Sequence, residues 1–400
     1  MTNNFFWSIV GYFLFCLWLA LSFSSALTLI CLWGALSAAV IAFFVNQHRE
    51  HAYIPERWLR IWIILFFAAA VLSVTVSHYP KQSFRGLLKL VQQFIILFVV
   101  FCFFSSQLRL NQWRQWLLLS FTLVTANGVT QYVTGVDFLR GFYAQASSAG
   151  WRLSGSFETY GKFASYLVCV VPVVLFSTFH CFRKKELRQE LILWIPLSLL
   201  GLFLLFATRS RGGVLAFIFG ISLVFILRRL WKGLLVLFLA GIIGFFFLPR
   251  SMVIHLDREN KEQSIIERFE LWHRAADVIR ARPLTGTGIN TYAVAHQQFD
   301  TRKNWRVQNY YAHNGYLQMA AEIGAPGLFF FLAFVFRWIW LYRPKHSDTG
   351  PEHDLRWGFL AGSLSFLILC LVDTSLHSPQ PVMTFWFVMG MLGASASVKA

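Results

Sequence analysis

Long apolar stretches alternate with short polar connections along most of this chain of 400 residues. A helix that spans a membrane needs about 20 mostly apolar residues. Backbone groups inside lipid must pair within the segment, which favours helices, and the alternating period of a membrane barrel is not found. The pattern therefore predicts an all-α polytopic membrane protein with about twelve transmembrane helices. They are expected at residues 5–22, 26–45, 58–76, 86–104, 115–133, 163–180, 191–207, 213–228, 231–248, 325–342, 357–373 and 381–397.

One polar segment, residues 249–312, is long enough to hold structure of its own. Apolar side chains recur in it at helical spacing, which predicts an amphipathic helix on the membrane face or over the bundle. These side chains are Ile265, Phe269, Trp272, Ala276 and Ile279. The chain is therefore expected to have three parts. They are an N-terminal bundle of about nine helices (1–248), a loop region with amphipathic helices (249–324) and about three C-terminal helices (325–400).

The composition excludes a disordered chain and a soluble two-domain enzyme, since 57% of the residues are hydrophobic and 13% are charged. The N-terminus shows neither a basic region nor a clear cleavage site, so residues 5–22 are expected to be retained as a span. The six cysteines form no CxxC pair and no cluster with histidine, which predicts neither a zinc site nor a disulfide framework. We expect no metal and no cofactor.

The net charge of +17 would favour a nucleic-acid partner in a soluble protein. In a membrane protein, Lys and Arg instead gather in cytoplasmic connections. Clusters at alternate connections fit this rule, and they place both termini in the cytoplasm. The clusters are Arg49, Arg57 and Arg60; Arg109 and Arg114; Arg183, Lys184, Lys185 and Arg188; Arg228, Arg229 and Lys232; and Arg343, Lys345 and Arg356.

Some cations then fall on the outer side, where orientation does not explain them. Arg209 and Arg211 lie in a turn too short to be a free loop, and Gly212 and Gly213 allow close approach of the next helix start. Backbone donors at a helix start favour an anion, and guanidinium groups strengthen that preference. The alternative is a pair of arginines that extend to the interface.

Arg85 and Lys89 lie one turn apart at the outer start of another span. An ionisable group inside an apolar stretch indicates function unless it reaches the headgroups, so both interpretations stay open for Lys89. In the long loop, Arg268 flanks the apolar stripe and is expected to point toward the bundle. The other loop cations are expected to form a solvated face. They are Arg274, Arg280, Arg282, Arg302, Lys303 and Arg306.

The sharpest local feature is His313-Asn314, followed by an amphipathic segment and a Gly-Ala-Pro-Gly sequence at residues 324–327. It predicts a helix that enters the membrane from outside and is broken near Gly324, as is tolerated where a helix lines a cavity. Asp373 ends a span on the same side, either as a partner of His313 or a basic residue, or as a helix-end residue in water. Glu322 either pairs with a buried cation or marks the polar face of the half-helix.

These residues resemble the signature of the O-antigen ligase superfamily, which also contains O-antigen polymerases and O-linked oligosaccharyltransferases. The pattern is His313-Asn314, nine residues, Gly324, two residues and Gly327. The outer turn and the long-loop helix are similar to the family's two arginine-bearing segments, which places its functional arginines at Arg211 and Arg268. By motif the resemblance covers about residues 200 to 375, and before that only the topology matches.

The resemblance implies a multi-helix glycosyltransferase of the GT-C type in the inner membrane of a Gram-negative cell, with its active site and long loop facing the periplasm. Its donor would be O-antigen polysaccharide on undecaprenyl pyrophosphate. Its acceptor would be lipid A–core oligosaccharide, in lipopolysaccharide biosynthesis. Transfer would be en bloc, inverting and metal-independent. Besides these two substrates and membrane lipids, no partner is expected, and nucleic acid is excluded.

The chemistry of such a transfer matches the residue types. A lipid pyrophosphate leaves the anomeric carbon and gathers negative charge, which permanently charged arginines stabilise. Arg211 and Arg268 are the expected clamp. Further binding residues are expected to be Lys89, Arg85, Arg209 and Asn314, supported by Asp373, Gly324 and Gly327. The acceptor hydroxyl needs a base that titrates near neutrality, and His313 is the candidate.

Three other functions remain open. An O-antigen polymerase shares the chemistry but uses another lipid-linked repeat as acceptor. A protein O-oligosaccharyltransferase usually carries additional C-terminal soluble sequence, whereas this chain ends shortly after its last span. A transporter of lipid-linked sugars would predict inverted repeats and a midplane site with broken helices in both halves, whereas one break near the outer face is found.

Overall fold

The computed structural model describes residues 5–46, 56–105, 107–146, 150–247, 258–299, 311–345 and 353–397. Helices dominate these residues. Extended pairing within them is limited to two isolated bridges, Val136 with Tyr143 and Gln145 with Arg152. The prediction of an all-α chain is therefore confirmed for the part that the structure describes.

Each of the twelve predicted apolar stretches overlaps a helix. These helices are α1 (Phe5–Ala20), α2 (Ser25–Asn46), α3 (Arg57–Thr75), α4 (Pro80–Phe103), α5 (Gln107–Thr134), α6 (Tyr160–Arg183), α7 (Leu191–Ala207), α8 (Arg211–Leu227), α9 (Trp231–Phe247), α13 (Gly315–Tyr342), α14 (His353–Leu369) and α15 (Pro379–Ser397). The remaining elements are η3 (Lys185–Glu190), α11 (Arg258–Ala281), α12 (Tyr292–Ala295), η4 (His296–Phe299) and η6 (Ser375–His377).

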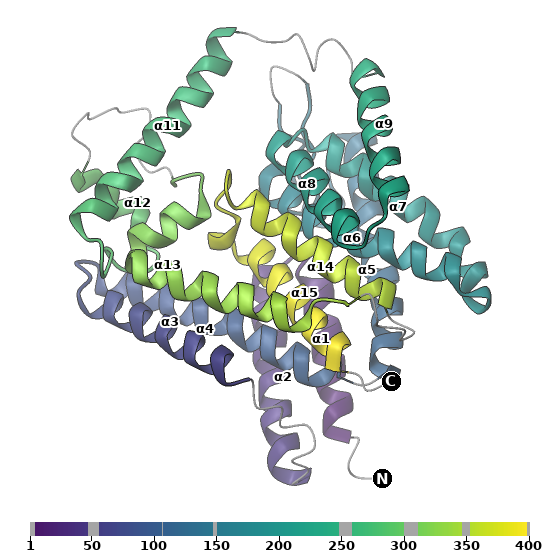
Figure 1. Ribbon diagram of the computed structural model, residues 1–400, viewed down its shortest axis with the longest axis horizontal. Coiled ribbons are helices and arrows are strands. Elements are labelled where there is room, and N and C mark those ends of the chain that lie inside the picture. The colour runs from purple at the N-terminus through teal and green to yellow at the C-terminus, as the bar shows by residue number, and fades with distance from the viewer. Residues whose placement is uncertain are drawn as a thin grey trace.

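The C-terminal helices α14 and α15 form the centre of the bundle (Figure 1). Helix α14 packs on α6 and α8, whereas α15 packs on α4 and α14. Helices α3, α4 and α13 lie side by side on one flank, with α11 and α12 over the start of α13. Nearly all of α15 is buried, since its side chains meet protein on every side. The last helix of the chain is therefore a core helix.

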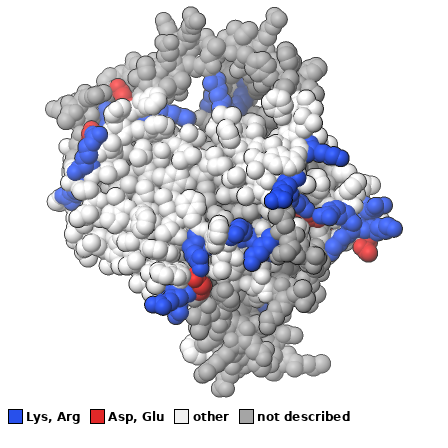
Figure 2. All heavy atoms as spheres, viewed as in Figure 1, with Lys and Arg blue, Asp and Glu red and all other residues white. Residues whose placement is uncertain are grey.

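The chain is a membrane protein by the length and apolarity of its helices. Among the described residues, six helical segments are long and apolar enough to cross a membrane. They are Ser25–Ala42, Arg57–Thr75, Pro80–Phe103, Tyr160–Arg183, Lys185–Ala207 and Gly315–Tyr342. Helices α1 and α8 are apolar but shorter. On the face drawn in Figure 2, Lys and Arg gather in groups at the edges of a broad area that carries no charged side chain. The count of twelve spans stays a prediction.

The turns that carry the predicted site meet at one end of the bundle. We call it the loop end, and define it by residues 135–146, 150–162, 207–213, 283–291 and 370–378. Contacts between them include the N–H of Leu153, which donates to the carbonyl of Ala207 at 3.2 Å. A Cβ on Gly212 would lie 3.1 Å from Val372. Residues far apart in the sequence are therefore brought to the same end.

At the opposite end, which we call the far end, acidic side chains pair with arginines of the predicted cytoplasmic clusters. Asp354 at the start of α14 pairs with Arg228 and, at 3.3 Å, with Arg183. Glu190 pairs with Arg114 at 2.9 Å. These basic residues therefore also join helices to one another.

Helix α13 is broken at Gly324, where φ is 82° and ψ is 164°. After the break, Pro326 has no N–H, so the carbonyl of Glu322 lacks its usual helical donor. The loop between α11 and α12 supplies one, because the N–H of Gly288 donates to that carbonyl at 3.0 Å. The N–H of Thr287 likewise donates to the carbonyl of Ala321 at 3.0 Å. The loop thus completes the backbone hydrogen bonding of the broken helix.

The same loop explains why residue 324 is glycine. The N–H of Ala325 turns away from the helix and donates to the carbonyl of Pro283 at 2.8 Å. A Cβ on Gly324 would lie 2.3 Å from the carbonyl oxygen of Leu284. Positive φ and this close approach together require a residue without a side chain. The predicted break near Gly324 is therefore present, and the loop packs directly into it.

Helix α11 contains the predicted amphipathic segment, and its closest contacts are made by a face that only partly coincides with the predicted apolar stripe. Side chains buried against the α12–α13 region are Leu271, Ala275 and Val278. Phe269 is 52% exposed. Ile279 of the predicted stripe packs on the same cluster. That the rest of the stripe lies on the membrane face stays a prediction.

One of the cations that were predicted to be solvated is buried instead. Arg274 lies on the contact face of α11 and is 6% exposed. Its charge acts on the buried Tyr292. Arg280 fits the prediction, since it is exposed and pairs with Asp277 at 2.8 Å. Arg282 contacts His78. Arg302, Lys303 and Arg306 lie outside the described residues.

Candidate active site

His313 lies immediately before the broken helix α13, in the left-handed backbone region with φ of 48°. Asn314 caps the helix, because its side-chain oxygen accepts from the N–H groups of Tyr316 and Leu317, both at 3.0 Å. Such a cap satisfies donors that have no partner within the helix. Asn314 therefore fixes the helix start beside His313, and its part in binding substrate stays a prediction.

Asp373 lies in the turn that follows α14, and this turn holds the start of α13. The N–H of Gly315 donates to the carbonyl of Asp373 at 3.0 Å and to that of Cys370 at 2.8 Å. The side chain of Asp373 accepts from the hydroxyl of Ser375. Ser375 in turn shares a 2.7 Å hydrogen bond with Ser165 of α6. Asp373 is thus fixed where α6, α13 and the end of α14 meet.

The structure brings Arg268 and Asp373 within electrostatic range of His313. Burial lowers the pKa of His313 below its ordinary value, the Asp373 carboxylate raises it, and the Arg268 guanidinium lowers it. The net direction is downward. His313 is therefore a neutral imidazole at neutral pH, the form able to accept a proton. Arg268 itself is exposed on α11.

Arg211 is the first residue of α8, and its position follows from local sequence. The side chain of Ser210 caps the helix by accepting from the N–H of Gly213 at 3.2 Å. Gly212 packs against Val372, one residue before Asp373. The absence of a side chain at Gly212 therefore lets the start of α8 approach the Asp373 turn, with Arg211 exposed at its tip.

The side chain of Arg209 is partly buried, whereas that of Arg211, two positions later, is exposed. Its φ is 55°, and a Cβ on Gly150 would lie 2.9 Å from its guanidinium group. Arg209 therefore packs against the backbone at Gly150. One of its guanidinium nitrogens, Nη1, is buried without a hydrogen-bond partner.

Arg85 and Lys89 lie on the first turns of α4 and are both exposed. The helix starts at Pro80, earlier than predicted, so both are within its regular part. Gly86 packs against Ile289 of the loop that fills the α13 break. Among the described residues, neither Arg85 nor Lys89 makes a hydrogen bond or ion pair with His313, Asp373, Arg211 or Arg268. Both therefore lie on α4, beside residues 283–291 of the loop end.

Gly324 and Gly327 support this arrangement from within α13. A Cβ on Gly327 would lie 2.5 Å from the Ile323 side chain and 3.7 Å from Ala69 of α3. Gly324 forms the break itself. Together they let α13 bend against α3, so that its first part reaches the Asp373 turn.

Two residues of the loop end were missed by the sequence reasoning. Lys162 lies on the first turn of α6, next to Gly161, where a Cβ would be 3.9 Å from the Asp373 carboxylate. Its ammonium group pairs with Glu158. His377 lies in the same outer turn as Asp373, four residues later, and contacts Glu322 at 3.8 Å. A histidine in a predicted outer turn was the signal available for His377, whereas nothing in the sequence placed Lys162 near Asp373.

Comparison with known proteins agrees with the motifs. Residues 196–332 match the family model described as O-Antigen ligase. This region holds Arg209, Arg211, Arg268, His313 and the α13 break, and it ends before Asp373.

Relatives extend the similarity to most of the chain, at low identity. A Rickettsia typhi protein named "putative polysaccharide ligase" is 23% identical over 387 residues, which cover 82% of this chain and 89% of the relative. A Rickettsia prowazekii protein of the same name is 22% identical over 361 residues, covering 79% and 82%. A third, from Rickettsia bellii, is 25% identical over 289 residues, covering 69% and 66%. Over residues 196–332 the chain is therefore similar to the O-antigen ligase family.

Proposed function

We propose that this protein is a glycosyltransferase that moves O-antigen polysaccharide from undecaprenyl pyrophosphate to lipid A–core oligosaccharide. The observation that carries the proposal is the meeting of His313, Asp373 and Arg268 in one electrostatic unit. The start of α8 with Arg211 packs against the same turn. A base and two guanidinium groups are the parts that displacement of a pyrophosphate requires.

The proposed reaction is a direct displacement with inversion. The acceptor hydroxyl oxygen attacks the anomeric carbon of the donor sugar, and its proton passes to the neutral ring of His313. The bond between the anomeric carbon and the phosphate oxygen breaks, and undecaprenyl pyrophosphate leaves with the electron pair. Asp373 stabilises the imidazolium that forms, because its negative charge favours the protonated ring.

Charge on the leaving pyrophosphate is assigned to Arg211 and Arg268 without a metal ion. A guanidinium group is always protonated and can form two parallel hydrogen bonds with a phosphate. Both side chains are exposed, Arg211 at the loop end and Arg268 on α11, where its charge acts on His313. Lys89, Arg85 and Arg209 are assigned a weaker role, in attracting the polyanionic donor toward the same end.

The topology proposed for this activity places the loop end in the periplasm and both termini in the cytoplasm of a Gram-negative inner membrane. It rests on the basic clusters at the far end, where Arg183 and Arg228 surround Asp354. Twelve spans and a GT-C architecture, with the domain division at residues 248 and 324, belong to the same proposal. Cysteine labelling at introduced sites on the two ends would test the orientation.

The activity is tested with purified protein in detergent, lipid-linked O-antigen and lipid A–core. A ladder of glycan attached to lipid A–core is the expected product. Growth of glycan on the lipid carrier alone would instead identify a polymerase, and transfer to a peptide acceptor would identify a protein oligosaccharyltransferase. Movement of intact donor between the leaflets of a vesicle, without any transfer, would identify a transporter of lipid-linked sugars. Each of these three outcomes would contradict the ligase proposal.

A further inference from the structure

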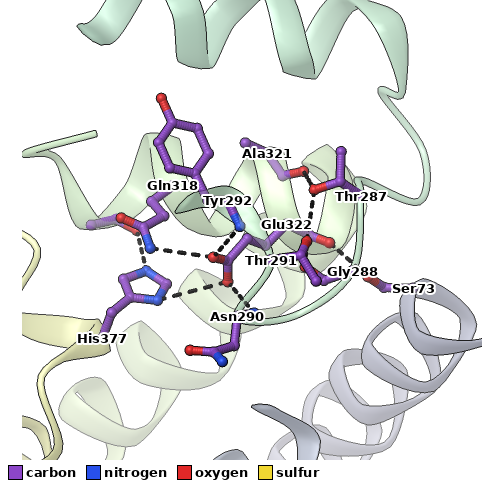
Figure 3. A network of polar contacts seen from close by, with 11 residues as sticks. Ser73, Thr287, Gly288, Asn290, Thr291, Tyr292, Gln318, Ala321, Glu322 and His377 are labelled. Atoms are coloured by element: carbon purple, nitrogen blue, oxygen red, sulfur yellow. Dashed lines mark hydrogen bonds and ion pairs between the residues drawn. The ribbon is translucent and has the colours of Figure 1, made fainter. Parts of the chain in front are cut away.

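Glu322 is a buried carboxylate that the proposed chemistry does not use. It lies on α13 just before the break and is 1% exposed. Its Oε2 accepts from the N–H of Asn290 at 2.8 Å. Its Oε1 accepts from the N–H of Tyr292 and from the Gln318 side chain, both at 3.2 Å (Figure 3). Three donors from two segments thus converge on one side chain.

A charged group at this depth requires such compensation, because burial of an unpaired carboxylate is costly. The backbone carbonyl oxygen of Glu322 also accepts two hydrogen bonds. The hydroxyl of Ser73 on α3 donates at 2.6 Å, and the N–H of Gly288 donates at 3.0 Å. Glu322 therefore joins α3, the loop before α12 and α13 at one point. Through His377 it also contacts a fourth element, η6.

The ring of His377 lies between Glu322 and the start of α13. Its Nδ1 is 3.8 Å from Oε2 of Glu322, and its Nε2 is 3.4 Å from the carbonyl oxygen of Gly315. Both neighbours are oxygen acceptors, which a ring N–H can meet. Gly315 is two residues from His313, and its own N–H holds the Asp373 turn. The contacts form a path from the break in α13 to the residue proposed as the base.

We propose that Glu322 and His377 are positioning residues for His313. Glu322 fixes His377, His377 fixes the first turn of α13 through the Gly315 carbonyl, and that turn sets the direction of the His313 ring. The catalytic part of this inference rests on the proposed function. The mechanical part, that the pair holds the first turn of α13, stands apart from any activity.

The mechanical part is tested by hydrogen exchange of the full-length protein in detergent micelles. Glu322→Gln places an NH2 group where an acceptor of several donors is needed, so at least one bond is lost. His377→Ala removes the link to Gly315. Both variants are expected to exchange about tenfold faster over residues 313–319 than the wild type, because local opening becomes easier.

Asp354→Asn is the matched control. Asp354 is also a buried carboxylate with several partners, but these are arginines at the far end, at the other terminus of α14. It is expected to leave exchange over residues 313–319 unchanged. Thermal unfolding of all variants separates local opening from general loss of the fold. Exchange in Glu322→Gln and His377→Ala equal to that of the control would overturn the proposal, whatever reaction the protein catalyses.

The catalytic part is tested by the separation of kcat from KM in the ligation assay. Both variants are expected to lower kcat by about tenfold or more with little change in the KM for donor, because misplacement of a base by about 1 Å is costly. His377→Gln keeps a donor near the position of Nε2 and is expected to retain more of kcat than His377→Ala. A general structural defect would not produce this rescue.

The two residues act in series, so the double variant Glu322→Gln/His377→Ala is expected to have the kcat of His377→Ala alone. If the losses in kcat of the two single variants multiplied in the double variant, the two residues would have independent roles, and the proposed order of action would be wrong. An unchanged kcat despite faster exchange would refute the positioning role. Transfer that survives His313→Ala would instead refute the base assignment, and the exchange result would still decide the mechanical part.

Discussion

The N–H of Gly315 donates to the carbonyl oxygen of Asp373 at 3.0 Å, and this bond joins the helix start beside His313 to the turn that carries its acidic neighbour. The two segments are separated by most of α13 and by all of α14 in the sequence. Their attachment holds the backbone beside the proposed base against the backbone of its acidic neighbour. The predictions below depend on this relationship.

His313→Ala is expected to lower kcat by about 10² to 10⁴ and to leave donor binding nearly unchanged, because a general base acts in the transition state. Single-turnover ligation measures the rate, and binding of labelled donor measures the affinity. His273→Ala is the control, since His273 is an exposed histidine of α11. Wild-type transfer by His313→Ala would refute the assignment.

The pH dependence of kcat/KM is expected to show an acid limb below about pH 6.5, because the pKa of His313 is lowered and the neutral ring is the base. Activity is lost as pH falls through that pKa. Asp373→Asn removes a negative charge that raises the pKa, so the limb moves to lower pH. Arg268→Gln removes a positive charge that lowers it, so the limb moves to higher pH.

The opposite directions of these two shifts are the diagnostic result. General damage to the site would lower the plateau of both variants without moving their limbs apart. Rate profiles from about pH 5 to pH 8 are sufficient for the measurement. Limbs that move in the same direction, or not at all, would show that the two charges do not act on the group that titrates.

Arg211→Ala is expected to reduce kcat/KM for donor by about 10- to 1000-fold, a range of a few kcal/mol typical for one lost donor to a developing anion. Arg211→Lys is expected to recover only part of this loss, because an ammonium group cannot form two parallel bonds with a phosphate. Arg229→Ala, at the other end of α8, provides the comparison. Equal activity of the Ala and Lys variants would exclude a charge-based role.

Gly324→Ala is expected to destabilise the protein more than Gly135→Ala. The two glycines have nearly the same φ, 82° and 81°, so the cost of a left-handed backbone, about 1 to 2 kcal/mol, is common to both. A Cβ at Gly135 meets nothing within 4 Å, whereas one at Gly324 would lie 2.3 Å from the carbonyl oxygen of Leu284. The difference in melting temperature therefore reports the contact between loop and break. Equal decreases in melting temperature would show that the loop can move away from a Cβ at residue 324 with no loss of stability.

Much of the candidate site was predictable because its residues carry local signals. The His313-Asn314 start, the glycine break and the arginine turn at Arg211 are each contained in a few consecutive residues. Asn314 and Ser210 are ordinary helix caps, so the starts of α13 and α8 follow from local chemistry. The deeply buried face of α11, with Ala275 and Val278, did not follow from periodicity, because contact with the α12–α13 region decides it.

The sequence by itself determined the helical membrane class, the positions of the helices and the types of residue available for chemistry, since apolar length and caps act within one segment. Only the tertiary structure decided which of those residues meet. The burial of Arg274, the links from Glu322 to His377 and from His377 to Gly315, and the filling of the α13 break by residues 283–288 all join segments distant in sequence. Such contacts depend on the packing of many helices at once, and no local pattern records them.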